Sequence, residues 1–263
     1  MGSCKCYCLQ PFEFKLDNDK GVRSVWTDEH FHKTYFKPRS HKVMKGDTNV
    51  VIVFEGALGA NSRLPVFDIT LTYTITSNGV DVEINAIKNS QLKGMNRSSS
   101  EETDLDLKLK TEIPEIPRFG MRFALDPELE QLEYFGKGDR ESYVDYQEHA
   151  KMGIWQSTVA EEYESYIRPQ ECGNHVGVKW VKLSGAEDVT FKAKEKFEFS
   201  ALHYTIEELD RAEHAFELEG SQTTELLICY KNRGVGSNSC GPALSEKYQV
   251  RDKEIHFGFE VRF

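Results

Sequence analysis

Carboxylate side chains concentrate in one stretch of this chain and could perform acid–base chemistry there. Glu141, Asp145 and Glu148 lie close together in the sequence, and His149 follows the last of them. A pair of carboxylates, one acting as an acid and the other as a base or nucleophile, is the arrangement that cleaves glycosidic bonds. A retaining enzyme holds the two carboxyl groups about 5 Å apart, so this interpretation requires the fold to bring two of these side chains together.

Two other clusters contain residue types that bind metals. Cys4, Cys6 and Cys8 alternate near the N-terminus, but no histidine or further cysteine follows at the spacing of a zinc site. His30 and His32 form a pair without a nearby third ligand. We therefore predict no metal site in this chain. The other three cysteines are isolated, which favours a reducing compartment and a cytoplasmic location; they are Cys172, Cys229 and Cys240.

The segments that must position these side chains have mostly the alternation of β-strands. Apolar residues alternate along 66–76, the turn 77–79 contains Asn-Gly, and 80–87 continues the alternation, so a hairpin is predicted. Many short strands separated by turns predict an all-β, antiparallel sandwich. The other predicted strands are 49–57, 105–109, 118–125, 176–181, 187–200, 226–230 and 256–263.

One or two short helices accompany the predicted strands. The apolar spacing from Trp26 to Phe36 suits an amphipathic helix that ends before Pro38. Thr205 can cap a second helix, with Glu208 three residues later as in a capping box. Residues 88–104 are polar and contain few strand-forming residues, so an exposed loop is predicted there.

The composition and net charge of the chain disfavour some classes of binding partner. The chain has 263 residues, 39% of them hydrophobic, and a formal net charge of −10. Binding to phosphate requires clustered lysine and arginine, so this charge disfavours nucleic acid and anionic membranes as partners. The sequence has no apolar run of transmembrane length and no visible secretory signal.

Five stretches, in order along the chain, resemble the motifs of one family. The stretches are Asp-Asn-Asp-x-Gly at 17–21, Pro-Arg-x-Gly at 117–120, Gly-x-Gly at 136–138 with Glu141, Tyr143 and Asp145 following, Pro-Gln-Glu-x-Gly-Asn at 169–174 before a strand with Trp180, and Gly-Val-Gly to Ser-Cys-Gly-Pro at 234–242. Together they cover about residues 12–263 and resemble the C-terminal, small-chain domain of family 2 β-galactosidases.

The resemblance implies a fold and a division of labour. It implies the supersandwich of the galactose-mutarotase-like type, and it implies that the catalytic carboxylates come from a (β/α)₈ barrel. This chain has no alternating strand–helix pattern and is too short to hold that barrel beside its strands. We therefore expect no catalytic residue and no cofactor in this chain, although the barrel chain of the family may bind Mg or Na. The implied partners are a β-galactoside carbohydrate and either a catalytic barrel chain or further copies in a homo-oligomer.

The resemblance also assigns two loops to the substrate pocket. In the family, the loop near the C-terminus reaches the rim of the barrel's pocket, and some members carry there a Trp that stacks on the sugar or aglycone. The position of that Trp is Cys240 in this chain. The residues assigned to the rim are Gly236, Ser237, Asn238, Ser239 and Cys240, and those assigned to a mobile loop near the pocket are Asp17, Asn18, Asp19 and Gly21.

The chain departs from the family pattern at its start and at single positions. Residues 1–11 read as a divergent or non-native lead-in, and 12–263 as the small-chain domain without its first strands, which would leave open sheet edges. Near the carboxylates, Tyr146 stands where the family has an arginine, which would pair with Asp145 or a nearby carboxylate. The other departures are Asp139 for Pro, Ser142 for Asn and Cys229 for Asp.

Two other functions remain open from the residues. The same fold type hosts aldose 1-epimerases, which use a histidine acid and a glutamate base, and Glu171, His175, His203 and His214 are available for those roles. A fold does not determine a function, and no epimerase motif surrounds these residues. The third possibility is a stand-alone carbohydrate-binding or structural module.

Overall fold

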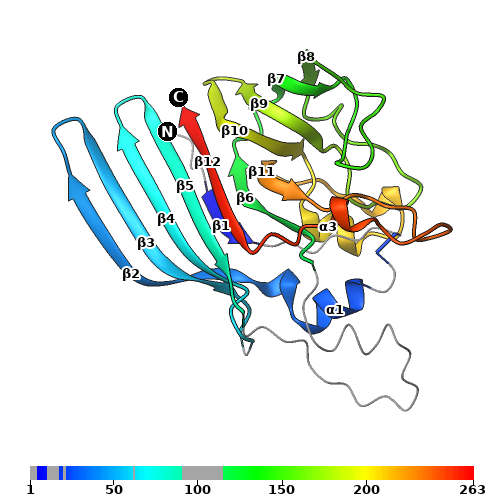
Figure 1. Cartoon of the computed structure of the whole chain (residues 1–263). Coiled ribbons are helices and arrows are strands. Elements are labelled where there is room, and N and C mark those ends of the chain that lie inside the picture. The colour runs from blue at the N-terminus through cyan, green and yellow to red at the C-terminus, as the bar shows by residue number, and fades with distance from the viewer. Residues whose placement is uncertain (1–4, 11–17, 20–21, 62, 91–114) are drawn as a thin grey trace.

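The computed structural model describes residues 5–10, 18–19, 22–61, 63–90 and 115–263, and these residues are mainly β-strand (Figure 1). The predicted strand 105–109 and most of the predicted loop 88–104 lie outside this range. Twelve strands are present in the described part of the chain: β1 (Lys5–Gln10), β2 (Tyr35–Lys45), β3 (Asn49–Gly59), β4 (Phe67–Thr76), β5 (Gly79–Lys88), β6 (Arg118–Leu125), β7 (Gln131–Gly138), β8 (Lys151–Thr158), β9 (His175–Ser184), β10 (Val189–Leu202), β11 (Thr224–Asn232) and β12 (Glu254–Arg262).

These strands form one continuous antiparallel sheet. Its order is β1-β6-β11-β10-β12-β5-β4-β3-β2, and β9 joins β10 to a branch that consists of β7 and β8. In Figure 1 the strands β2 to β5 spread to one side, away from the group β7 to β10, with β12 between the two halves. The predicted all-β, antiparallel class is confirmed.

The β4–β5 hairpin shows why local sequence determined much of this sheet. Phe67, Ile69 and Leu71 alternate along β4 and are buried, as expected for one face of a pleated strand. Gly79 has φ 143°, a conformation that glycine adopts without the steric penalty of a Cβ atom. The predicted strands 49–57, 66–76 and 80–87 are thus confirmed as β3, β4 and β5.

The first predicted helix is wrong in its second half. The helix α1 spans Arg23–Asp28, His30 then adopts a left-handed φ of 60°, and a single 3₁₀ turn, η1 (Phe31–Lys33), precedes β2. Pro38 lies within β2, where the pairing register with β3 shifts between Pro38 and Ser40. Proline is tolerated there because β2 is an edge strand.

The second helix is confirmed as α3 (Ile206–Arg211), and Thr205 caps it by accepting a hydrogen bond from the backbone N–H of Glu208 at 3.1 Å. The Glu208 carboxylate accepts from the backbone N–H groups of Glu219 and Gly220, so it ties the helix to the following loop. Two more 3₁₀ turns are η2 (Ala215–Glu217) and η3 (Glu246–Tyr248).

The N-terminal segment belongs to the sheet. The backbone of β1 pairs with β6, with Lys5 opposite Ala124. The division of the chain at residue 11 and the absence of leading strands stay predictions.

The hydrophobic core lies between the two halves of the sheet. Aromatic rings from three strands meet there: Phe123 of β6 contacts Phe191 of β10 and Phe259 of β12 at centroid distances of 5.0 and 6.0 Å. Burying this apolar surface is the main driving force for the fold. The loops described next extend from the ends of the strands that enclose this core.

Candidate functional site

The two loops that the sequence assigned to a substrate pocket are in contact. The side-chain amide of Asn18 donates to the backbone carbonyl of Gly236 at 2.8 Å, and its oxygen accepts from the backbone N–H of Ser239 at 3.0 Å. One side chain therefore bridges both ends of the segment from Gly236 to Ser239. Asp17 and Gly21 lie outside the described residues.

Asp145 holds the first half of the loop 234–242. Its two carboxylate oxygens accept from the backbone N–H groups of Val235 and Gly236 at 2.9 and 2.8 Å. A Cβ atom at Gly234 would lie 2.6 Å from the Asp145 carboxyl group, so a larger residue there would displace this carboxylate. Asp145 thus has a structural role, and the sequence predicted neither contact.

A buried ion cluster links the same two loops in the interior of the protein. Arg233 pairs with Asp19 at 2.7 Å and with Glu115 at 2.9 Å, and all three side chains are buried. Trp26 supports the cluster: the Arg233 guanidinium lies 5.6 Å from its ring centroid, and its indole N–H donates to the Glu115 backbone carbonyl. Burial raises the pKa of the Glu115 carboxyl above its usual value, although Arg233 acts in the opposite direction.

The end of β11 is fixed by a second buried network. The Asn232 side-chain amide donates to Glu198 at 2.9 Å and to Asn174 at 2.7 Å, and the Asn174 amide also donates to Glu198. Burial raises the pKa of Glu198 to about 7, while the hydrogen bonds from the two asparagines lower it less. Because Asn232 directly precedes Arg233, this network sets the position from which the loop 234–242 starts.

A third group of buried polar side chains lies near Cys229. Arg118 forms an ion pair with Glu171, and the Tyr143 hydroxyl donates to the other Glu171 oxygen at 3.3 Å. Burial raises the pKa of Glu171 against the lowering effect of Arg118. Burial also raises the pKa of the Cys229 thiol to about 12, so the thiol is protonated at neutral pH.

The tip of the loop 234–242 is exposed. The backbone N–H groups of Cys240 and Gly241 donate to the Ser237 carbonyl at 3.1 and 2.6 Å, which closes a tight turn. Ser237, Ser239 and Cys240 are exposed, and Asn238 is half-buried. The hydroxyl groups of Ser237 and Ser239 and the thiol of Cys240 therefore belong to side chains at the surface of the molecule.

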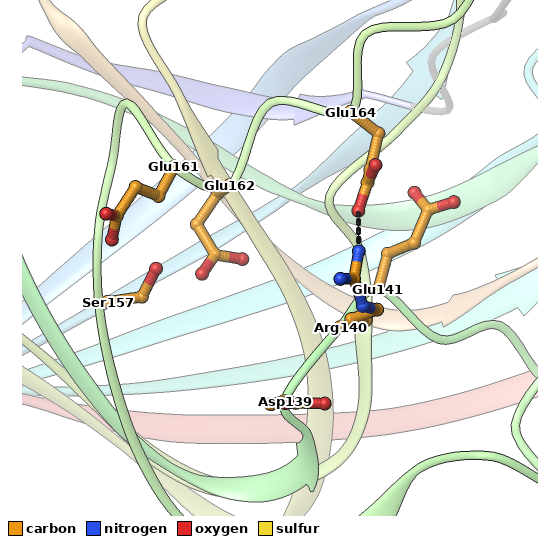
Figure 2. Close-up of a pocket in the computed structure, with 7 residues that line it drawn as sticks. All are labelled: Asp139, Arg140, Glu141, Ser157, Glu161, Glu162 and Glu164. Atoms are coloured by element: carbon orange, nitrogen blue, oxygen red, sulfur yellow. Dashed lines mark ion pairs between the residues drawn. The ribbon is translucent and has the colours of Figure 1, made fainter.

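Five carboxylate residues line a small pocket of about 220 Å³ elsewhere in the structure (Figure 2). Figure 2 shows Glu161 and Glu162 on one side of it, with Arg140, Glu141 and Glu164 on the other. Arg140 and Glu164 form an ion pair at 3.9 Å. The remaining lining residues are Asp139 and Ser157.

The buried carboxylates of this pocket are bound to the protein itself. Glu141 accepts from the Tyr166 hydroxyl and from the Gly173 backbone N–H. Glu162 pairs with His175, whose other ring nitrogen lies 3.0 Å from the Tyr134 hydroxyl. These contacts give the carboxylates structural partners, which disfavours the acid–base interpretation of this stretch.

The residues considered for an epimerase each contact a different set of partners. Glu171 contacts Arg118 and Tyr143, whereas His175 is fully buried and stacks on Phe199 at 5.1 Å. The other two candidate histidines are separate from this pair: His203 contacts Glu130, and His214 contacts Glu217.

The described residues contain neither a cluster of metal ligands nor a helix that could span a membrane. Within the ranges that the structure covers, no group of three or more His, Cys, Asp or Glu side chains is arranged to hold a metal ion. In the same ranges, no helix has the length and apolar character needed to cross a membrane.

The chain matches one protein family along most of its length. Residues 10–261 match a family model described as beta galactosidase small chain. The chain is 32% identical over 98% of its length to a β-galactosidase of Actinobacillus pleuropneumoniae, 29% identical over 94% to that of Staphylococcus xylosus, and 30% identical over 84% to that of Kluyveromyces lactis. The matches cover 24%, 23% and 21% of these relatives, so the chain spans about a quarter of their length.

Proposed function

Because this chain belongs to the β-galactosidase small-chain family, we propose that it is the non-catalytic part of a family 2 glycoside hydrolase that acts on β-galactosides. In this proposal the chain completes a pocket whose catalytic carboxylates and any Mg or Na belong to a (β/α)₈ barrel polypeptide. The barrel polypeptide is the principal partner, and self-association into a homo-oligomer is compatible with it. The galactose-mutarotase-like subtype of the sandwich and a cytoplasmic location are parts of the same proposal.

The bridge formed by Asn18 carries this proposal. Asn18 and the segment from Gly236 to Ser239 were assigned to the pocket separately, on motifs far apart in the sequence, and the structure joins them by two hydrogen bonds. The joined loops expose the serine hydroxyls and the Cys240 thiol. Groups of this kind can donate to and accept from sugar hydroxyls at a pocket rim.

A chimeric enzyme tests the proposal. Residues 10–261 of this chain would replace the aligned quarter of the A. pleuropneumoniae β-galactosidase, and hydrolysis of o-nitrophenyl galactoside would be measured for the chimera and for the isolated chain. We expect the chimera to hydrolyse the galactoside and the isolated chain not to. Turnover by the purified isolated chain that Glu171→Gln abolishes would contradict the proposal.

A matched pair of variants tests the role of the loops. Asn18→Ala in the chimera removes the bridge, and the loss of its hydrogen bonds should raise KM by about two- to tenfold, with a smaller change in kcat. Asn78→Ala, in the exposed turn between β4 and β5, is the control and should leave KM unchanged. Equal KM values for the two variants would reject the rim assignment. Binding of lactose by the isolated chain would favour a stand-alone carbohydrate-binding module.

A further inference from the structure

A cleft of about 410 Å³ opens where β12 separates from β10. The pairing of these two strands ends at Ala193 and Phe259, and from Glu198 onward β10 pairs with β11. The segment 256–258 of β12 therefore has β5 on one side and the cleft on the other. The volume falls within the range of roughly 300–1,000 Å³ that sites for small molecules occupy.

One wall of the cleft offers a hydrogen-bond donor next to an acceptor. Asn85 and His256 are directly paired between β5 and β12, and the His256 Nδ1 lies 2.6 Å from the Asn85 Oδ1. The ring nitrogen donates to the amide oxygen, which leaves the Asn85 N–H groups as donors and the Nε2 of the neutral ring as an acceptor. A sugar hydroxyl is both a donor and an acceptor, so two neighbouring hydroxyls match this pair.

The charged side chains around the cleft balance one another. Lys194 pairs with Glu83, and its stem passes Gly258 so closely that a Cβ atom there would lie 2.9 Å from it. Lys196 and Glu195 are the other Lys and Glu residues of the lining. Two cations and two anions give no net charge when the histidine is neutral, so the cleft favours a neutral ligand over a phosphate or an amine.

An aromatic ring supplies the apolar part of the cleft. Tyr230 is half-buried, and its hydroxyl donates to Asp252 at 3.2 Å, which holds the ring in one orientation. Phe257 packs against this ring, with the two centroids 6.1 Å apart. A pyranose presents an apolar C–H face as well as its hydroxyls, so an aromatic ring beside a polar pair fits both parts of it.

We propose that this cleft is a second, non-catalytic carbohydrate site that binds one neutral pyranose unit. Asn85 and His256 hydrogen-bond to neighbouring hydroxyls, and the C–H face of the sugar lies against Tyr230. Paired strands carry all three side chains, so their positions are set before the sugar binds. The site goes beyond the proposed function and does not depend on it, because the rim segment 236–240 contributes no residue to the lining.

Titration of the isolated chain with galactose tests the site. The backbone amide NMR signals of residues 256–258 would be followed as the sugar is added. We expect saturable shifts with a Kd on the order of 1–10 mM, because a single sugar makes few contacts. Galactitol, the open-chain polyol without a pyranose face, should bind at least about tenfold more weakly. Shifts that never saturate with galactose, or equal binding of galactitol, would overturn the proposal.

Matched substitutions locate the bound sugar. Asn85→Ala and His256→Ala remove the polar pair at exposed positions, and each should weaken galactose binding by about five- to tenfold. Asn78→Ala in the turn after β4 and His41→Ala on β2 remove the same side-chain types at other exposed positions and should leave binding unchanged. If either Asn85→Ala or His256→Ala binds galactose as tightly as the unaltered chain, the cleft is not the site.

The chimeric enzyme separates this site from the proposed function. Asn85→Ala in the chimera should leave kcat/KM for o-nitrophenyl galactoside unchanged, because the cleft and the rim share no residue. A fall in kcat/KM would place Asn85 in the catalytic pocket and overturn a separate site. An active chimera whose cleft binds no galactose rejects this site alone, and an inactive chimera whose cleft binds it rejects the proposed function alone. Binding that Asn85→Ala weakens, in a chain whose chimera is active, identifies a second site and not a stand-alone module.

Discussion

Arg233 and Asp19 are 214 positions apart in the sequence, and their side chains form a buried ion pair at 2.7 Å. Asp19 directly follows Asn18, and Arg233 directly precedes Gly234, so the pair holds the starts of the two loops together. The contact between the proposed rim loop and the loop that contains Asn18 therefore has a buried ion pair beneath it.

Replacing Arg233 with methionine should be strongly destabilising. The substitution leaves Asp19 and Glu115 buried without their cation, and breaking a buried pair in this way costs about 3–5 kcal/mol. Urea denaturation of the isolated chain would measure the free energy of unfolding. The control is Arg39→Met, whose partner Asp68 is exposed; its cost should stay within about 1 kcal/mol. If both variants lose the same free energy of unfolding, the buried Arg233 cluster contributes no more to stability than an exposed ion pair.

Glu198 should make stability depend on pH. Its pKa in the folded chain is about 7, above the ordinary value of 4.5, so between these values the folded state binds more protons than the unfolded state. Its contribution to stability is therefore complete below about pH 4.5 and lost as pH rises through about 7, by on the order of 3 kcal/mol. Glu198→Gln should flatten this part of the pH profile and stabilise the chain at pH 8.

The contribution of Glu198 is the difference between the pH profiles of the unfolding free energy for the wild-type chain and for Glu198→Gln. Glu115, Glu141 and Glu171 also have raised pKa values through burial, so the wild-type curve alone does not identify Glu198. Glu195→Gln, at an exposed position of the same strand β10, is the control. If Glu198→Gln and Glu195→Gln give the same unfolding free energies from pH 5 to pH 8, Glu198 is not the source.

The local parts of the fold were predictable from the sequence, and the site contacts were largely not. The hairpin turn predicted at 77–79 and the cap at Thr205 were correct because each depends on neighbouring residues. The strand β2 was missed because its exposed residues have no core alternation, and the predicted helix ran into it instead.

Long-range polar contacts have no local signal at all. The motifs placed Asn18 and the segment 236–240 near one pocket, but not the hydrogen bonds between them. Arg233 and Glu115 are separated by 118 positions, so no spacing rule could pair them. The only available clue was a basic residue directly before the Gly-Val-Gly motif.

Cys229 and Glu198 should be energetically coupled. The two residues are paired in the β10–β11 ladder, and Glu171 and Arg118 also influence the Cys229 thiol. Cys229→Asp, the residue type expected from the family, adds a further carboxylate beside Glu198 and should destabilise the chain by about 1–3 kcal/mol at pH 8. Glu198→Gln should relieve much of this loss, because it removes one of the charges. A double-mutant cycle measured by denaturation would give the coupling, and additive losses would exclude it.

Cys240 offers the most direct test of contact with substrate. In a chimeric enzyme, Cys240→Trp places a flat apolar ring at the exposed tip of the loop 234–242. Stacking on the sugar or aglycone should improve the inhibition constant of an aryl galactoside by about two- to tenfold, which corresponds to about 0.5–1.5 kcal/mol. Ala243→Trp adds the same ring at an exposed position just beyond the loop and should leave the constant unchanged. If the loop only closes a connection between β11 and β12, Cys240→Trp will shift the unfolding free energy without changing inhibition, and the rim assignment fails because the altered side chain never meets the sugar.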